Sequence, residues 1–360
     1  MFEIKKSIKK IEPYRTGKSA VDGLSSVIKL SSNENPFGTS IKASNAYRQA
    51  SENLNRYPIG SSERLIDGIS EIHNLNYKKI ICGSGSDELI KLISYAFLNE
   101  GDEAVISEFG FIMYKISTLG AGATPVIAKE TDYTTNIDSY IKAVTDKTKI
   151  CFIANPNNPT GTYISKEEII RLRNSIPQDI IIVIDSAYAE YIEQEDYCDG
   201  SDLVDNYNNI IMLRTFSKIY ALAALRLGWA YASEEILDIL NRIRPPFNVN
   251  LAAQAAGLAA LYDRDFIQHC VKQNHDIKDF MTEALKHNGL KPIKSYGNFL
   301  LVKFDDDKKT AEKANDFLLG QGIITRPVGN YGINDCLRIS VGNEEEVKTL
   351  IRTLANFMNL

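Results

Sequence analysis

The chain has 360 residues, of which 44% are hydrophobic, so it is long enough for two domains or for one large domain with an appendage. Its 41 basic and 46 acidic side chains are mixed along the sequence, and the net charge of −5 argues against a surface for nucleic acid or an anionic membrane. No apolar run approaches the roughly 20 residues of a membrane helix, and no apolar run follows the basic N-terminus as in a signal peptide.

The five cysteines are scattered and lack the spacing of metal ligands. An odd number of scattered thiols is typical of reduced cysteines in a cytoplasmic protein. We therefore expect a cytoplasmic location and no metal site.

Short apolar runs alternate with helical patterns over most of the chain. The runs typical of buried strands are residues 79–82, 104–107, 124–128, 150–154, 180–184, 210–213 and 228–232. Because they show no alternation of apolar and polar residues, they fit parallel strands that are buried on both faces. The order of strands and helices predicts an α/β fold, a three-layer sandwich built on a mostly parallel sheet.

The pattern changes near residue 263, where a smaller α+β domain is expected to begin. Its expected elements are a long polar helix at 266–288, a strand at 298–304, a helix at 310–321 and a strand at 337–341. We expect residues 1–40 to form an N-terminal arm and part of the small domain, residues 41–262 the large ligand-binding domain, and residues 263–360 the small C-terminal domain.

Lys218 follows the expected strand at 210–213, in the segment Thr-Phe-Ser-Lys, and Arg226 stands eight residues later. Polar groups beyond the carboxyl ends of parallel strands lie where open α/β sheets bind ligands. A buried or cation-flanked lysine has a lowered pKa, which frees its amine as a nucleophile and proton carrier. A lone lysine after a strand is more often a surface residue. Here Thr215 and Arg226 stand at offsets that favour pyridoxal phosphate bound to Lys218 as a Schiff base.

Asp185 ends the apolar run at 180–184, where a carboxylate needs a partner because burying a lone charge is expensive. The proposed partner is the protonated pyridine nitrogen of the cofactor, which makes the ring an electron sink. The alternative is that Asp185 caps a helix. Tyr188 and Asn158 would donate to the phenolic oxygen of the cofactor, although the segment around Asn158 could also be a simple turn.

The cofactor phosphate needs several donors, and two segments supply them. These are Gly85, Ser86 and Asp87 at an expected helix N-terminus, and Thr215, Ser217 and Arg226. The pattern Gly-x-Gly-x-x-Gly of dinucleotide sites is absent, because Glu88 takes its last position. Phe111 could stack on the pyridine face or could be a core aromatic.

Together these residues resemble the fold-type I, class I and II pyridoxal-phosphate aminotransferases, and in detail the histidinol-phosphate aminotransferase branch. The segments that match are 12–18 (EPYRTGK), 30–38 (LSSNENPFG), 56–58 (RYP), 215–218 (TFSK) and 336–342 (CLRISVG). The arm departs from the family pattern at Thr16-Gly17, where Pro-Gly is common. The resemblance therefore does not fix the path of the arm, although it still implies the chemistry.

The resemblance implies a role for each residue. Lys218 is the Schiff-base lysine, Asp185 the partner of the ring nitrogen, Tyr188 and Asn158 the contacts of the phenolic oxygen, and Phe111 the stacking aromatic. Tyr57 would reach the cofactor phosphate of the neighbouring subunit in a homodimer with shared active sites. The expected substrate contacts are Tyr14, Asn35, Arg326 and Arg338.

The implied reaction is transamination of L-histidinol phosphate with 2-oxoglutarate, giving imidazole acetol phosphate and glutamate in histidine biosynthesis. An aromatic amino-acid aminotransferase of the same branch is the main alternative, because both substrates combine a flat ring with an anion. A decarboxylase or lyase on the same fold fits less well, since the substrate arginine is present. A regulator with a DNA-binding module is disfavoured because the motifs begin near Tyr14, and a purely structural protein would not need these polar groups.

Overall fold

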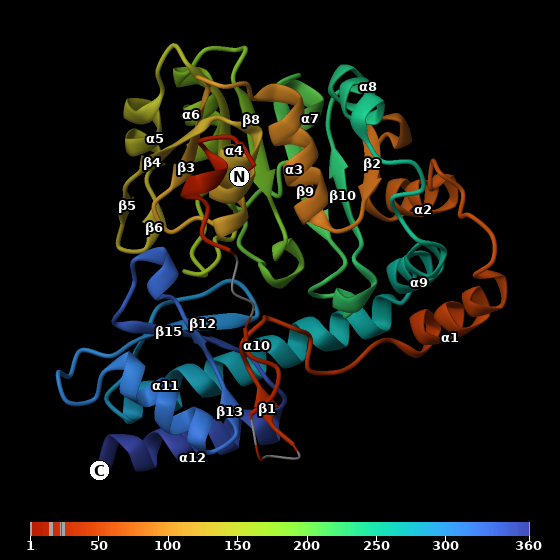
Figure 1. The fold of residues 1–360 in the computed structure, drawn as a ribbon. Coiled ribbons are helices and arrows are strands. Elements are labelled where there is room, and N and C mark those ends of the chain that lie inside the picture. Colours follow the sequence, from red (N-terminus) through yellow and green to blue (C-terminus); the bar gives the residue numbers. More distant parts are fainter. Residues whose placement is uncertain (1, 14–16, 22, 24–25, 360) are drawn as a thin grey trace.

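The computed structural model describes residues 2–13, 17–21, 23 and 26–359. The chain forms a large lobe around a seven-stranded sheet and a small lobe around a four-stranded sheet (Figure 1). The long helix α10 (Arg264–His287) runs from the end of the large lobe along the small one.

The large sheet has the strand order β2-β10-β9-β8-β7-β3-β4. Its strands are β2 (Ile80–Gly83), β3 (Glu103–Ser107), β4 (Thr124–Ala128), β7 (Thr148–Ala154), β8 (Ile181–Asp185), β9 (Ile210–Thr215) and β10 (Gly228–Tyr231). Six of them are parallel to one another, and β10 is antiparallel to both of its neighbours. The mostly parallel sheet is thus confirmed.

Strand β10 corrects one detail of the sequence analysis, which grouped residues 228–232 with the parallel strands. Trp229, Ala230 and Tyr231 are buried, as in a parallel strand. Burial on both faces depends on the helices that cover the sheet and not on strand direction, so an apolar run alone does not reveal an antiparallel strand.

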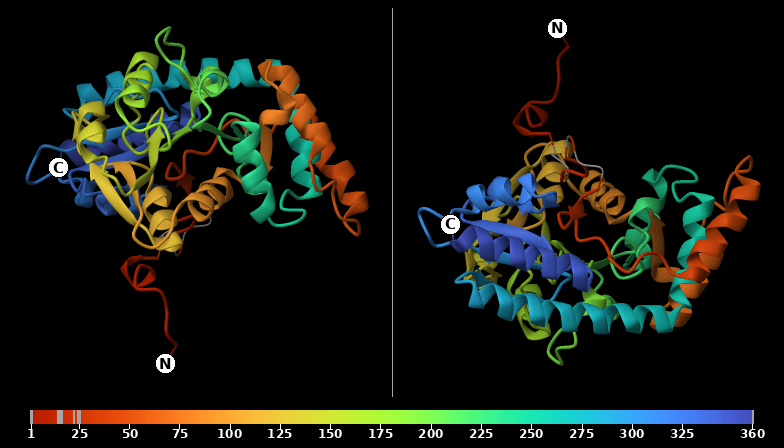
Figure 2. Two further views of the ribbon diagram at one scale, coloured as in Figure 1. Left: turned by 90° about the horizontal axis from the view of Figure 1, so that it is seen from above. Right: turned by 90° about the horizontal axis from the view of Figure 1, so that it is seen from below.

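Helices cover both faces of the large sheet, as the two views of Figure 2 also show. They are α2 (Glu63–His73), α3 (Ser86–Phe97), α4 (Ile112–Ala121), α5 (Ile137–Ala143), α6 (Lys166–Ser175), α7 (Ser201–Asn206), α8 (Glu234–Ile243) and α9 (Leu251–Leu261). Helix α1 (Ile41–Ala50) lies beyond them and packs against α9 (Figure 1). The neighbouring residues Val105 and Ile106 of β3 belong to two different apolar clusters, one on each side of the sheet. This arrangement is the predicted three-layer sandwich.

The small lobe has an antiparallel sheet in the order β11-β12-β15-β14. Its elements are β11 (Lys291–Pro292), β12 (Phe299–Lys303), α11 (Ala311–Gly320), β13 (Ile323–Ile324), β14 (Arg326–Pro327), β15 (Cys336–Ser340) and α12 (Glu344–Asn359). The N-terminal strand β1 (Ile28–Lys29) pairs in parallel with β13, and Leu30 is buried in the core of this lobe. The domain limits at residues 40 and 262 remain a prediction.

The remaining elements are short. They are the strands β5 (Glu130–Thr131) and β6 (Thr134–Thr135) and the 3-10 helices η1 (Ile8–Lys10), η2 (Ser51–Asn53), η3 (Tyr77–Lys79), η4 (Ala189–Tyr191), η5 (Ala223–Leu225) and η6 (Gly329–Tyr331). The first described residues, from Phe2 onward, project away from both lobes (Figure 2), and Phe2 is 97% exposed. Within the described residues, no helix is both long and apolar enough to cross a bilayer.

Candidate active site

A cavity of about 260 Å³ lies where the carboxyl ends of the parallel strands face the small lobe. The predicted site residues that line it are Ser86, Asp87, Phe111, Asn158, Asp185, Tyr188, Thr215, Ser217, Lys218, Arg226, Arg326 and Arg338. Residues that follow β3, β7, β8 and β9 therefore meet residues of the small sheet in one place. This is the edge where open α/β sheets bind ligands.

Lys218 lies three residues beyond the end of β9, and its Nζ donates to the Ser32 carbonyl at 3.1 Å. Burial, and after it the nearby Arg338 cation, lowers the pKa of Lys218 to about 8. The amine therefore loses its proton more easily than an exposed lysine, as a nucleophile requires.

Asp185 is the last residue of β8, and its two carboxylate oxygens have different surroundings. Oδ2 accepts a hydrogen bond from Tyr114 Oη at 2.8 Å, while Oδ1 is buried without a hydrogen-bond partner in the described part of the chain. Burial raises the pKa of Asp185 to about 6, because the charged form is poorly solvated there. A buried acceptor on the cavity wall fits a protonated ring nitrogen.

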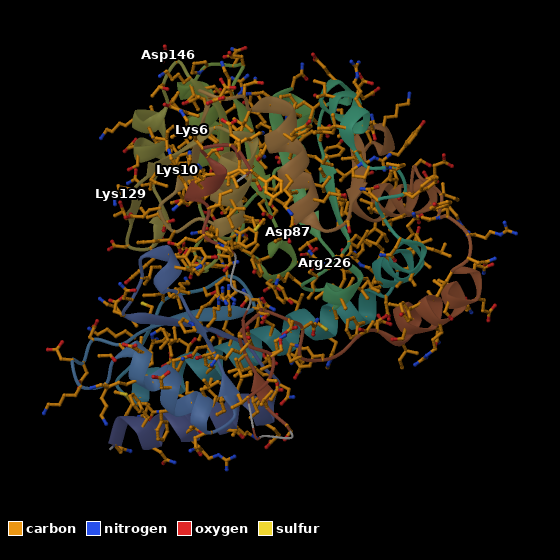
Figure 3. The ribbon with its side chains drawn as sticks, in the orientation of Figure 1. Lys6, Lys10, Asp87, Lys129, Asp146 and Arg226 are labelled. Atoms are coloured by element: carbon orange, nitrogen blue, oxygen red, sulfur yellow. The ribbon has the colours of Figure 1, made fainter. Side chains whose placement is uncertain are left out.

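The residues expected to hold the cofactor phosphate form a cradle at the start of α3. Gly85 has φ +81°, and a Cβ at this position would lie 2.7 Å from Arg226 Nη2. Arg226 contacts Ser217 Oγ at 3.3 Å and Asp87 Oδ2 at 3.1 Å, and Figure 3 shows Asp87 and Arg226 together at the edge of the large lobe. An arginine, a hydroxyl and the backbone N–H groups of a helix N-terminus are suited to a phosphate.

Tyr188 and Asn158 lie on the cavity wall, and the side-chain oxygen of each already accepts a hydrogen bond. Tyr188 Oη accepts from Asn33 Nδ2 at 2.9 Å, and Asn158 Oδ1 accepts from Arg338 Nη1 at 2.6 Å. Burial raises the pKa of Tyr188 to about 12, so its hydroxyl keeps a proton to donate. These contacts leave the Tyr188 hydroxyl hydrogen and the Asn158 amide hydrogens for a ligand.

Two arginines of the small sheet face the same cavity. Arg326 of β14 and Arg338 of β15 are directly opposite each other in the antiparallel register. Arg338 Nη2 also donates to the Ser31 carbonyl at 2.6 Å, which ties the strand to the N-terminal segment. Two guanidinium groups that line the same cavity as Lys218 can hold an anionic substrate.

Besides Gly85, which adjoins the lining residue Arg226, three predicted residues do not line this cavity or cannot be placed. Asn35 donates to the Ile219 carbonyl at 2.9 Å and does not line the cavity. Tyr57 stacks on Phe247 and is 82% exposed, away from the cavity of its own chain. Tyr14 lies outside the described residues.

The structure also brings in residues that the sequence analysis did not single out. Asn33 and Tyr331 line the cavity, as does Tyr114, which is bonded to Asp185. Asn33 lies in the quoted segment 30–38, so its motif was visible although its role was not. Tyr114 gave no signal beyond that of an apolar helix face.

The family described as "Aminotransferase class I and II" matches residues 25–354. Histidinol-phosphate aminotransferases of Maricaulis maris and Paramagnetospirillum magneticum are 44% and 45% identical to this chain, over 99% and 97% of it and 99% and 96% of their own lengths. The crystal structure of the Sinorhizobium meliloti histidinol-phosphate aminotransferase with pyridoxal-5′-phosphate has a TM-score of 0.88 and 26% identity, covering 93% of this chain and 92% of that one. The chain therefore belongs to the class I and II aminotransferases, within the histidinol-phosphate aminotransferase branch.

Proposed function

We propose that this protein uses pyridoxal 5′-phosphate to transfer the amino group of L-histidinol phosphate to 2-oxoglutarate, in histidine biosynthesis. The identity of 44% and 45% to histidinol-phosphate aminotransferases over nearly the whole chain supports this reaction. The structural observation that supports it most is the pair Arg326 and Arg338, opposite each other across two strands and lining the cavity that contains Lys218.

The cofactor, when bound, supplies an electron sink that stabilises the charge left as the substrate Cα loses its proton. Asp185 Oδ1 would hold the proton on the ring nitrogen, and Phe111 would pack on the ring face. Lys218 Nζ would remove the Cα proton, because a pKa of about 8 leaves part of the amine neutral near physiological pH. Arg226 and the start of α3 would hold the cofactor phosphate.

The two arginines favour a phosphorylated substrate over an aromatic amino acid. A phosphate dianion can accept hydrogen bonds from both guanidinium groups, whereas a single carboxylate is satisfied by one of them. The aromatic aminotransferase is accordingly the less favoured alternative.

We further propose a homodimer in which each subunit completes the other's site. Tyr57 stacks on Phe247, does not line the cavity of its own chain and is 82% exposed, so its side chain is available to a second subunit. Sedimentation of the purified protein tests the dimer, and a fully active monomer at low concentration would contradict it.

We also propose a cytoplasmic location. All five cysteines are free and buried, which supports it.

The substrate is tested with the purified enzyme, 2-oxoglutarate and three amino donors. We expect kcat/KM for L-histidinol phosphate to exceed the values for L-histidinol and phenylalanine by about 100-fold, because only the first carries the dianion. Equal or better turnover of phenylalanine would overturn the assignment and favour the aromatic aminotransferase.

A further inference from the structure

Tyr114 is a buried tyrosine in the first turn of α4 whose hydroxyl reaches the base of the cavity. It is 1% exposed, and its Oη donates to Asp185 Oδ2 at 2.8 Å. Its ring stacks on Phe152 of β7, with centroids 4.9 Å apart and planes 4° apart. The edge of Phe111 meets the same ring at 5.8 Å and 87°. These contacts fix the position of the hydroxyl.

The hydrogen bond from Tyr114 makes the two oxygens of the Asp185 carboxylate different from each other. A carboxylate rotates easily about its last bond, because this torsion joins tetrahedral and planar atoms. With Oδ2 held by Tyr114, Oδ1 is the oxygen that remains for a ligand, and it has no other hydrogen bond within the described residues. We propose that Tyr114 is a positioning residue that orients the Asp185 carboxylate toward the ring nitrogen of the cofactor. This inference relies on the proposed cofactor chemistry.

The charges around Asp185 add a second consequence. Burial raises the pKa of Asp185, and the Asp87 carboxylate raises it further. The Tyr114 hydrogen bond, the Ala187 backbone N–H and the Lys218 cation act in the opposite direction, since each favours the ionised form. The pKa of Tyr114 itself lies well above its ordinary value because of burial, so the hydroxyl stays protonated and remains a donor. Loss of this hydroxyl should therefore raise the pKa of Asp185.

Phe111 extends the effect of Tyr114 to the face of the cofactor. Phe111 lines the cavity and is the residue expected to stack on the pyridine ring. Since its ring rests on the Tyr114 ring and not on the hydroxyl, a Tyr114→Phe variant keeps this contact and removes a single oxygen. The variant thus isolates the hydrogen bond to Asp185.

Tyr140 provides a matched control. It is 0% exposed, and its hydroxyl donates to the Phe152 carbonyl at 2.6 Å. Tyr140 belongs to the apolar cluster on the other face of the sheet from Tyr114 and does not line the cavity. Tyr140→Phe therefore deletes the same atom from an equally buried tyrosine without touching Asp185.

The experiment uses the full-length parent, Tyr114→Phe and Tyr140→Phe. For each protein, the Kd of pyridoxal phosphate is measured by fluorescence titration of the apoenzyme. Then kcat, KM for L-histidinol phosphate and the pH profile of kcat are measured for the loaded enzyme. We expect Tyr114→Phe to raise the Kd and lower kcat by about 10-fold to 100-fold, which is the usual effect of a hydrogen bond to a charged group. KM should stay near the parent value, and the acidic limb of the profile should move to higher pH. Tyr140→Phe should match the parent in all of these.

A double-variant cycle with Asp185→Asn separates positioning from general loss of structure. If Tyr114 acts through the carboxylate, adding Tyr114→Phe to Asp185→Asn should change the Kd and kcat much less than it changes the parent. Equal effects in both backgrounds, or a Tyr114→Phe variant whose Kd and pH profile match those of Tyr140→Phe, would overturn the inference. A parent that binds pyridoxal phosphate but does not turn over histidinol phosphate contradicts only the proposed substrate. A parent that binds no pyridoxal phosphate overturns both.

Discussion

The two ends of the cavity are built in different ways. At the end proposed for the cofactor, Asp185, Lys218 and the cradle at Gly85 belong to one lobe and lie at or just beyond the ends of strands in a single sheet. At the anion end, Arg338 belongs to the small sheet, yet it is held by the Ser31 carbonyl and by Asn158 from two other segments. Changes at the cofactor end should therefore affect every substrate, whereas changes at the anion end should depend on the substrate's charge.

The largest effect is expected from Lys218→Ala at the cofactor end. Removal of the amine deletes both the nucleophile and the proton carrier, so transamination should fall by at least about 10⁴-fold with every donor. Borohydride treatment followed by peptide mass spectrometry should find a cofactor adduct on Lys218 in the parent and none in the variant. A colourless parent without a reducible lysine adduct would contradict the cofactor assignment.

Arg338→Ala should have the next largest effect. Losing one partner of a buried, hydrogen-bonded charge pair costs about 2–5 kcal/mol, or roughly 30-fold to 4,000-fold in kcat/KM for any anionic substrate. We expect the Kd of pyridoxal phosphate to change far less, because Arg226 and the start of α3 are intact. A variant with parent kinetics toward both histidinol phosphate and glutamate would remove Arg338 from the substrate site.

Arg326→Ala should separate the substrates. Because Arg326 is the second cation opposite Arg338, its loss should lower kcat/KM for histidinol phosphate by about 10-fold to 100-fold. The loss should be smaller for glutamate or phenylalanine, whose anions carry one charge. The comparison needs kcat/KM for all three donors in the parent and the variant. Equal losses for all three would contradict the assignment of a phosphate to this pair.

The same contrast explains which parts of the molecule the sequence could predict. The meeting of Asp185 and Lys218 at one cavity could be predicted because each follows an apolar run, and strand ends of a parallel sheet share one edge. The bonds of Asn33 to Tyr188 and of Tyr114 to Asp185 join positions 155 and 71 residues apart. Periodicity within one segment carries no information about such pairs, so these residues were not identified.

Asn35 shows a second limit. Asn33 and Asn35 stand two residues apart in the segment 30–38, and in a regular strand their side chains would share one side. Asn33, however, has φ +53°, in the left-handed region, which breaks the alternation. Asn33 consequently lines the cavity while Asn35 bonds to the Ile219 carbonyl, a difference that the sequence motif does not reveal.

Gly85→Ala tests the phosphate cradle with a smaller expected effect. An alanine would be strained at φ +81°, and its Cβ would press on Arg226 Nη2. We expect the Kd of pyridoxal phosphate to rise about 10-fold, as for a penalty of about 1–2 kcal/mol. Gly101→Ala is the control, because Gly101 has φ +98° but no atom within 4 Å of its Cβ position. Equal Kd values for the two variants would show that Gly85 does not shape the cradle.

The smallest effect is expected from substitution of Lys278, a residue of α10, and concerns the stability of the protein. Its Nζ donates to the Gly297 carbonyl at 3.1 Å, and the adjacent Asn298 donates to the Asn33 carbonyl at 3.1 Å. Burial lowers the pKa of Lys278 to about 8, so the folded state disfavours its charged form. Below pH 8 the lysine is protonated in both the folded and the unfolded state, and the full cost of burying the charge is present.

That cost is relieved as the pH rises from about 8 toward the unfolded value of 10.5, because the unfolded chain then binds more protons than the folded one. Lys278→Met removes this dependence and keeps an apolar side chain of similar length. The difference in Tm between the parent and the variant should therefore shift by about 2 °C in favour of the parent between pH 7.5 and 9.5. Lys218 is present in both proteins, so its own titration cancels in the difference. A Tm difference that does not change with pH would mean that Lys278 is solvated in the folded protein.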